Sequence, residues 1–375
     1  MKNPRIISFL PAATEMVYAL GLGDLLVGVS HECDFPAAAK SKPVVVKPAL
    51  PLETMSLREI DVAVAKRIGS GQSLYEVDEN LLRELKPDMI LTQNLCQVCG
   101  PSGNEITVAL KLLQPKPEIV WMTPHSLEDI FQNIRELGAV TERVAEAEAL
   151  VCSLRQRLEK VSSLTRNVVR RPRIFCLEWV DPCYCCGHWV PEMVEFAGAE
   201  DALGRKGTDS VRMAWTDIVA WAPEILIVAP CGFNTEQAVA QAKMLLRQPG
   251  WSKIPAVRNN KVFAVNANAY FARPGPRVVD GVELLAHLVH PEICEWAGPA
   301  EAFQRIDPRQ VQPLPAREKV CPECGASFAC GSEGGAGRCW CDQMPALPAS
   351  ALAQSDCLCP KCLARVVENA RIQTA

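Results

Sequence analysis

The stretch from residue 126 to residue 169 constrains the fold more than any other feature of this chain. It is rich in Leu, Ala, Glu, Gln and Arg, and it contains one glycine, Gly138, and no proline. Apolar side chains recur in it at helical spacing, as at Leu127, Ile130 and Ile134. We therefore predict a long helix that is interrupted near Gly138. This helix divides the chain into a part before it and a part after it.

Each of these two parts carries the pattern of an α/β sheet. Apolar runs at residues 5–9 and 25–30 enclose a helical pattern at residues 11–20, and such a strand–helix–strand unit implies a parallel sheet. Residues 81–93 have the pattern of a helix end, a turn at a proline and then a buried strand. Residues 217–230 repeat this order of elements. We predict an α/β protein with two open α/β lobes bridged by the long helix, plus a small cysteine-rich zinc module.

The domain boundaries follow from these patterns and from a proline-rich, charged stretch late in the chain. We expect an N-terminal lobe at residues 1–125, a bridging helix at 126–170 and a C-terminal lobe at 171–296. A linker at 297–320 and a cysteine-rich module at 321–375 would follow.

Composition narrows the possible functions. The 375 residues include 39 Lys and Arg against 43 Asp and Glu, a formal charge of −4, so a nucleic-acid partner is not expected. No run of eighteen apolar residues exists, which predicts no membrane span. The first residues also lack the pattern of a secretory signal peptide, so we expect a cytoplasmic protein. In a reducing compartment its 18 cysteines would be core residues, metal ligands or reactive thiols.

Residues 6–30 resemble the opening of the helical-backbone substrate-binding proteins of ABC importers for cobalamin, haem and ferric siderophores. The resemblance extends over roughly residues 4–295. Shorter segments are similar to the branch described as cobalamin-binding proteins, namely residues 31–36, 93–99, 187–192, 230–233 and 270–277. The resemblance implies a small-molecule ligand held between two lobes that move little, and an ABC permease as partner. Because no export signal is recognised, a cytoplasmic protein partner is the alternative.

Ligands of open parallel sheets bind beyond the carboxyl ends of the strands. Seven of the ten cysteines before residue 300, and two of the five histidines, follow predicted strands. If the lobes face each other, these loops share one cleft. The candidate ligand-binding residues are His31, Glu32, Cys33, Gln93, Asn94, Cys96, Cys99, Glu178, Trp179, Cys183, Cys185, Cys186, His188, Trp189, Cys231, Phe233, Tyr270, Phe271 and Arg273.

The first interpretation of this cleft is a corrinoid site, most simply for cobalamin. His31 or His188 would ligate the metal of the ligand, and Arg273 would be a polar anchor unless it is an ordinary surface residue. Aromatic side chains would stack on the ring, namely Trp189, Phe233 and Tyr270.

Three other interpretations stay open for the same residues. Cys96 and Cys99, together with thiols of the group at residues 183–186, could hold a metal ion or an iron–sulfur cluster. A thiol-dependent enzyme would use Cys33 beside His31 and Glu32, although we expect no enzyme activity. The plainest alternative is that these thiols are small apolar packing residues.

The last eight cysteines lie within about forty residues, with glycine-rich connections that leave no room for an ordinary core. We expect a structural metal ion to hold the segment together, and eight thiolates satisfy two tetrahedral zinc sites. The segment resembles the cysteine-rich CWC family through its Cys-Trp-Cys signature, which implies metal binding. The predicted zinc ligands are Cys321, Cys324, Cys330, Cys339, Cys341, Cys357, Cys359 and Cys362.

Overall fold

The computed structural model of the chain describes residues 3–94, 107, 111–307, 317–321, 323–324, 326–330 and 358–373. It separates into two compact units. The first comprises Met1–Leu245 and Gly250–Ile306, and the second comprises Leu246–Pro249 and Asp307–Ala375. Among the described residues, no helix combines the length and the apolar character that a membrane span requires.

The N-terminal lobe is built on a six-stranded sheet in the order β4-β3-β2-β1-β5-β6. All pairings are parallel except that of β3 with β4. The strands are β1 (Ile6–Ser8), β2 (Leu26–Ser30), β3 (Val44–Pro48), β4 (Tyr75–Val77), β5 (Met89–Thr92) and β6 (Glu118–Trp121). The helices of this lobe that are described over their whole length are α1 (Pro11–Ala19), α2 (Leu57–Gly69) and α3 (Glu79–Leu85), with short 3-10 turns at Gly23–Leu25, Ala37–Ser41 and Leu52–Thr54.

Local sequence accounts for these helix boundaries. Pro11 is the first residue of α1, where its missing N–H costs nothing. At α2 the Ser56 hydroxyl accepts from the Glu59 N–H while the Glu59 carboxylate accepts from the Ser56 N–H, which completes a capping box. Asp78 caps α3, which ends at Lys86 in the left-handed conformation.

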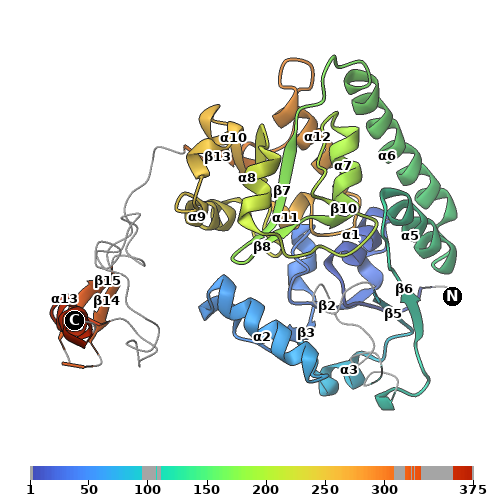
Figure 1. Ribbon diagram of the computed structural model, residues 1–375. Helices are drawn as coiled ribbons and strands as arrows, with labels where there is room; N and C mark the ends of the chain where they lie inside the picture. Colours follow the sequence, from blue (N-terminus) through green and yellow to red (C-terminus); the bar gives the residue numbers. More distant parts are fainter. Residues whose placement is uncertain are drawn as a thin grey trace. The chain divides into compact units, whose positions relative to one another are not determined.

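The segment predicted as one long helix forms two, α5 (Leu127–Val140) and α6 (Val144–Thr165). The break falls after Gly138, where Glu142 has a φ of 57°. A Cβ atom on Gly138 would lie 2.4 Å from the Cβ of Ala147, so glycine is required for the close approach of the two helices. In Figure 1 they lie alongside each other, both in green. The connection between the lobes is therefore a helical hairpin rather than a single rod.

The C-terminal lobe has a five-stranded sheet in the order β13-β12-β11-β7-β8. Its three inner strands are parallel, and both edge strands are antiparallel to their neighbours. The strands are β7 (Ile174–Val180), β8 (Cys183–Cys185), β11 (Ile225–Val228), β12 (Val262–Val265) and β13 (Phe303–Arg305), with a separate pair β9 (Gly187–His188) and β10 (Arg205–Lys206). The helices are α7 (Val190–Phe196), α8 (Trp215–Trp221), α9 (Thr235–Leu245), α10 (Pro255–Arg258), α11 (Ala267–Tyr270) and α12 (Val278–Val289), with 3-10 turns at Trp251–Lys253 and Ala300–Ala302.

One apolar core runs through both lobes and the helical hairpin. It includes Ile6 of β1, Ile130 of α5, Val151 of α6 and Leu285 of α12, all fully buried. Helix α6 packs on α7 and α12. The Arg157 guanidinium of α6 binds the Glu283 carboxylate of α12 at 2.9 and 2.6 Å. The lobes are therefore joined by continuous packing, which opposes large hinge motion.

The second unit contains β14 (Arg317–Val320), which pairs antiparallel with β15 (Ser327–Cys330), and the helix α13 (Pro360–Gln373). Its described buried cluster consists of Cys321, Cys359 and Cys362, with Phe328 and Leu358 packed against them. Three thiols thus occupy the place that aliphatic side chains hold in an ordinary core.

Asp201 gives this fold a testable pH dependence. Its carboxylate is enclosed by backbone and accepts from the N–H groups of Cys176, Leu203 and Gly204 at 3.0 to 3.1 Å. Burial raises the pKa of Asp201 from 3.8 to about 6. The folded chain therefore holds this proton at pH values where the unfolded chain has lost it. The contribution of Asp201 to stability is fully present below about pH 4 and is lost as the pH rises through about 6.

We expect the free energy of unfolding of the wild type, relative to Asp201→Asn, to fall by up to about 3 kcal/mol between about pH 4 and pH 7. Urea titrations followed by tryptophan fluorescence measure this difference. The exposed Asp217→Asn serves as control and should show no such trend. Parallel pH curves for the wild type and Asp201→Asn would contradict the prediction.

Candidate functional site

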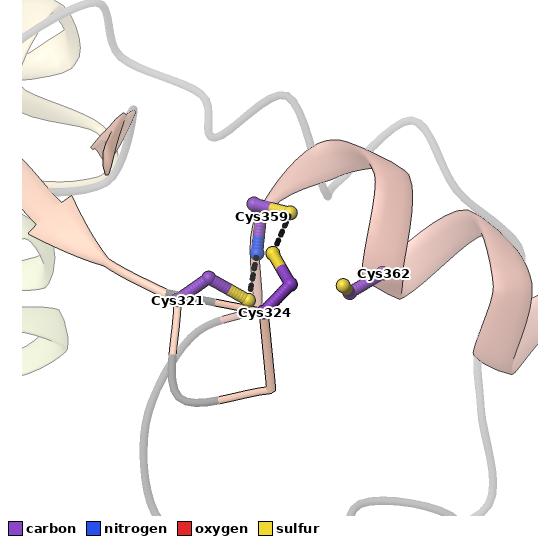
Figure 2. Close-up of side chains that lie close together, drawn as sticks. All are labelled: Cys321, Cys324, Cys359 and Cys362. Carbon is purple, nitrogen blue, oxygen red and sulfur yellow. Dashed lines mark hydrogen bonds between the residues drawn. The ribbon is translucent and has the colours of Figure 1, made fainter. Parts of the chain in front are cut away.

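Four thiols converge in the second unit. Cys321 and Cys324 lie in the turn between β14 and β15, and Cys359 and Cys362 lie at the start of α13. All four Sγ atoms lie within 4.8 Å of one another, and Figure 2 shows them pointing toward a common centre. Four sulfurs around one zinc ion, with Zn–S bonds of about 2.3 Å, would lie about 3.8 Å apart. The Sγ atoms of Cys324 and Cys359 lie 3.6 Å apart, so the arrangement fits a tetrahedral metal site.

The electrostatics of this centre also favour a cation. The backbone N–H of Cys359 donates to the Cys321 Sγ at 3.3 Å, and this contact is the main cause that lowers the pKa of Cys321 to about 6. Burial and the neighbouring thiols raise the pKa of Cys362. Four thiols at this spacing cannot all ionise without a positive charge between them. A soft thiolate set selects zinc, copper(I) or iron–sulfur over magnesium or calcium.

The structure does not describe the side chains of the other four predicted ligands of the module. The backbone of Cys330 ends β15, but its side chain is outside the described set. Cys339, Cys341 and Cys357 also lie outside the described residues. One four-thiol centre of the two predicted is therefore formed here, and the second stays a prediction.

In the first unit, the loops beyond the carboxyl ends of the strands meet across the two lobes. His125 follows β6 and lies with its ring centre 6.0 Å from that of His188, which is part of β9. Asp34 follows β2 and pairs with Arg273, which follows α11. The predicted convergence of these loops is present, although the residues that touch are imidazoles and charged groups rather than thiols.

A buried charge cluster accounts for Arg273. Its guanidinium donates to the Glu32 carbonyl at 2.9 Å and pairs with Asp34, and the side chain is only 6% exposed. Nearby, Arg277 donates to both carboxylate oxygens of the buried Glu15, at 2.9 and 2.5 Å. Arg273 is therefore not a surface residue. Both of its Nη atoms are engaged, whereas its buried Nε has no hydrogen-bond partner among the described residues, and its role as a polar anchor stays a prediction. Arg273 joins α11 of one lobe to the loop after β2 of the other.

The thiols expected in the cleft are mostly core residues. Cys33 is buried and its Sγ accepts from the Thr14 hydroxyl at 3.0 Å. Cys183 is buried within the sheet, and burial raises its pKa to about 11. Cys185 and Cys186 are also buried, whereas Cys231 is half-buried. Cys96 and Cys99 lie outside the described residues. Cys183 and Cys185 are buried because β8 pairs with β7, whereas Cys33 and Cys186 belong to the main apolar core.

Three of the aromatic candidate ligand-binding residues are also in the core. Trp189 is 5% exposed, and its indole N–H donates to the Phe271 carbonyl at 2.8 Å. Phe271 is buried, and Tyr270 packs edge-on against Trp296 at 5.8 Å. These rings hold α11 and the start of α7 in place and do not offer a free surface.

Trp179 and Phe233 differ from these rings. They are half-buried and stack with ring centres 5.7 Å apart, beside the carboxyl ends of β7 and β11. The Trp179 Nε1 atom is buried and has no hydrogen-bond partner among the described residues. An unpaired buried donor costs about 1–3 kcal/mol, so a bound acceptor here would be stabilising.

Polar groups also lie at or after the ends of strands in both sheets. Glu178 accepts from the Ser210 hydroxyl at 2.9 Å, and the Asn94 backbone N–H donates to the Thr123 hydroxyl at 3.2 Å. His31 is exposed beside the carboxylate of Glu32, at 3.9 Å. Gln93, the next residue after β5, is buried.

His188 is half-buried, and burial is the main cause that lowers its pKa.

Sequence reasoning missed His125, Ser210 and Asp209. His125 was detectable, since it follows the apolar run of β6 just as His31 follows β2.

Two family models match this chain. A family model described as "Periplasmic binding protein" matches residues 6–269. The chain belongs to the periplasmic binding protein family. A second model, "Cysteine-rich CWC", matches residues 321–364 and so covers the four-thiol centre.

Relatives of this chain support the same family. The Vitamin B12-binding protein of Vibrio parahaemolyticus serotype O3:K6 is 25% identical over 293 residues, which cover 78% of this chain and 88% of the relative. The uncharacterized ABC transporter substrate-binding lipoprotein YvrC of Bacillus subtilis is 26% identical, covering 78% of this chain and 82% of the relative. The chain is thus related to the substrate-binding proteins of ABC importers.

Solved structures agree on the fold. The periplasmic vitamin B12 binding protein BtuF of Vibrio cholerae superposes with a TM-score of 0.55 at 24% identity, covering 77% of this chain and 97% of that chain. The periplasmic heme-binding protein RhuT of Roseiflexus sp. RS-1 gives a TM-score of 0.57 at 19% identity, covering 77% and 98%. At these identities the likeness concerns the two-lobe architecture alone.

Proposed function

We propose that this chain binds one corrinoid, most simply cobalamin, between the carboxyl ends of its two sheets. The observation that carries the proposal is the half-buried stack of Trp179 on Phe233 at that edge. A flat macrocycle offers such a pair a large apolar face. The relatives named as vitamin B12-binding proteins favour a corrinoid over other flat ligands.

The polar groups at this edge suit the periphery of a corrinoid, which carries amide side chains. The Trp179 N–H is buried and unpaired, so it would donate to an amide carbonyl once the side chains that cover it move aside. The continuous core between the lobes would hold both halves of the site in register before the ligand arrives, which limits the entropy lost on binding.

Binding rather than catalysis is the proposed activity. Burial raises the pKa values of Cys33, Cys183 and Cys185, so these thiols would remain protonated near neutral pH. An activated nucleophile requires the opposite shift. The cytoplasm remains the proposed location of the binding unit, where its partner would be a cytoplasmic protein, and an ABC permease is the alternative partner.

Zinc is the proposed metal of the four-thiol centre. A closed set of four cysteines leaves no open position for substrate, so the role would be structural. Cys321, Cys324, Cys359 and Cys362 would hold the ion, and the ion would supply the folding energy that this small unit lacks.

Variants of Trp179 test the corrinoid proposal. Trp179→Ala should weaken cobalamin binding by about 10- to 100-fold, because it removes the stacking face and the indole donor together. Trp179→Phe keeps a ring and removes only the donor, so its loss should be smaller. Isothermal titration of the full chain with cobalamin gives each dissociation constant.

Trp221→Ala is the matched control. Trp221 is also a half-buried indole of the C-terminal lobe, but it donates to the carbonyl of Ile174, at the opposite end of β7. Its loss should leave the affinity unchanged. Equal affinity in Trp179→Ala and the wild type would contradict the proposed site, and haem binding without cobalamin binding would contradict the proposed ligand.

A further inference from the structure

Helix α2 has very little apolar packing of its own. It belongs to the connection between β3 and β4 at the edge of the N-terminal sheet. Leu57 is the only buried residue of this helix, whereas most residues of α12 are buried. Val62, in the middle of α2, is 60% exposed. An element with so few buried apolar contacts separates from the rest of a protein at low cost in free energy.

One acidic residue ties this helix to the other lobe. The Asp61 Oδ1 accepts from the Tyr184 hydroxyl at 3.1 Å, and the Asp61 Oδ2 pairs with the Arg212 guanidinium. The Nε–H of Arg212 donates to the Tyr184 hydroxyl oxygen at 3.0 Å, which closes a ring of three contacts. The Asp61 side chain is only 11% exposed. Hydrogen bonds to a shielded carboxylate are stronger than those between neutral groups.

A second, weaker contact lies on the same face of α2. Arg58 precedes Asp61 by three residues, so both side chains lie on one side of the helix. The Arg58 Nε lies 3.7 Å from the Asp181 Oδ1, but Arg58 is 76% exposed and the pair contributes little. In Figure 1, α2 lies beneath β8 and far from the helices α5 and α6. The contacts of α2 with the C-terminal lobe are therefore separate from the helical connection between the lobes.

The contacts of α2 lie beside the stacked rings of the proposed ligand site. Tyr184 of β8 pairs with Trp179 of β7 across the strand ladder, and Trp179 stacks on Phe233. The Trp179 Nε1 is buried and unpaired among the described residues, so a ligand reaches it only after neighbouring groups move. Continuous apolar packing opposes such movement at the helical hairpin. The polar contacts of Asp61 can break and form again in water, so α2 is the element best suited to open.

We propose that α2 is a gate of the corrinoid site and that Asp61 is the positioning residue that holds the gate closed. The gate presupposes the corrinoid site proposed above. Because Asp61 binds Tyr184 and Arg212 rather than the ligand, its contacts stabilise the closed chain equally with and without ligand. They therefore slow association and dissociation by the same factor and leave the affinity unchanged.

The variant Asp61→Asn tests this role. It keeps the shape of the side chain but removes the charge that binds Arg212. Stopped-flow absorbance of the full chain with cyanocobalamin gives both rate constants. We expect each to rise by about 5- to 20-fold, and the dissociation constant to stay within about twofold of the wild type. Asp217→Asn, which removes an exposed carboxylate of α8, should leave both rate constants unchanged.

Hydrogen exchange of the ligand-free chain tests the gate without cobalamin. Amides of residues 57–69 should exchange faster in Asp61→Asn than in the wild type, and those of β7 should not change. Wild-type rate constants in Asp61→Asn would overturn the proposal. A weaker affinity through faster dissociation alone would also overturn it, because Asp61 would then be a ligand contact. If the wild type binds no cobalamin, the proposed function fails, and unchanged exchange of α2 in Asp61→Asn is then the result that overturns the gate.

Discussion

Changing Cys321 and Cys324 together to serine is expected to remove the metal from the four-thiol centre and to unfold the second unit. The described buried cluster of this unit consists of the thiols themselves, with Phe328 and Leu358 against them. Structural zinc binding contributes about 10–16 kcal/mol in small zinc peptides, far more than such a core supplies. Metal analysis of the purified chain and limited proteolysis of the region after residue 317 measure both effects.

Cys152→Ser is the control for this change, because Cys152 is an exposed thiol on α6 in the first unit. It should leave both metal content and proteolysis unchanged. The wild type should carry zinc and lose it to a strong chelator, with faster cleavage of the second unit. A metal-free second unit that still resists protease would contradict this account.

Breaking the buried pair of Glu15 and Arg277 is expected to cost about 3–5 kcal/mol of stability. Glu15 is 4% exposed, and Arg277→Met would leave its carboxylate without the two hydrogen bonds that now satisfy it. Burial already raises the pKa of Glu15 even with Arg277 present. Urea unfolding at neutral pH measures the loss, and Glu15→Gln combined with Arg277→Met should recover part of it, because no carboxylate is then buried without its arginine.

A surface pair of the same chemistry serves as comparison. Arg170 binds both carboxylate oxygens of Glu224 at 2.9 and 2.6 Å, but its side chain is 70% exposed. Arg170→Met should therefore have little effect on stability. Equal losses in Arg170→Met and Arg277→Met would show that burial of the Glu15 pair is not the source of the effect.

The sequence predicted the two lobes because their strands and helices carry strong local signals. Residues 174–180 and 225–228 are apolar runs bounded by proline turns, and such runs form buried parallel strands. The break between α5 and α6 was expected near Gly138. Its position at Glu142 depends on the packing of α6 against α5, which periodicity does not reveal.

The candidate ligand residues were harder to predict, because a position after a strand does not fix which way a side chain points. The sequence predicts loop positions for Cys183 and Cys185, but the two residues belong to an edge strand paired with β7, and their side chains are buried. Trp189 precedes α7, where an indole can reach the Phe271 carbonyl of a segment 82 residues away. The inter-lobe pairs of Arg273 and of His125 likewise join distant segments. Such contacts are set by tertiary structure, which a single sequence does not encode in any local pattern.

A titration of the full chain with cobalamin, followed by visible absorbance, tests the central claim most directly. The account predicts a saturable spectral change with one cobalamin per chain, absent when Trp179→Ala is titrated over the same range. An unchanged spectrum at a large excess of cobalamin, with a folded wild-type chain, would contradict it.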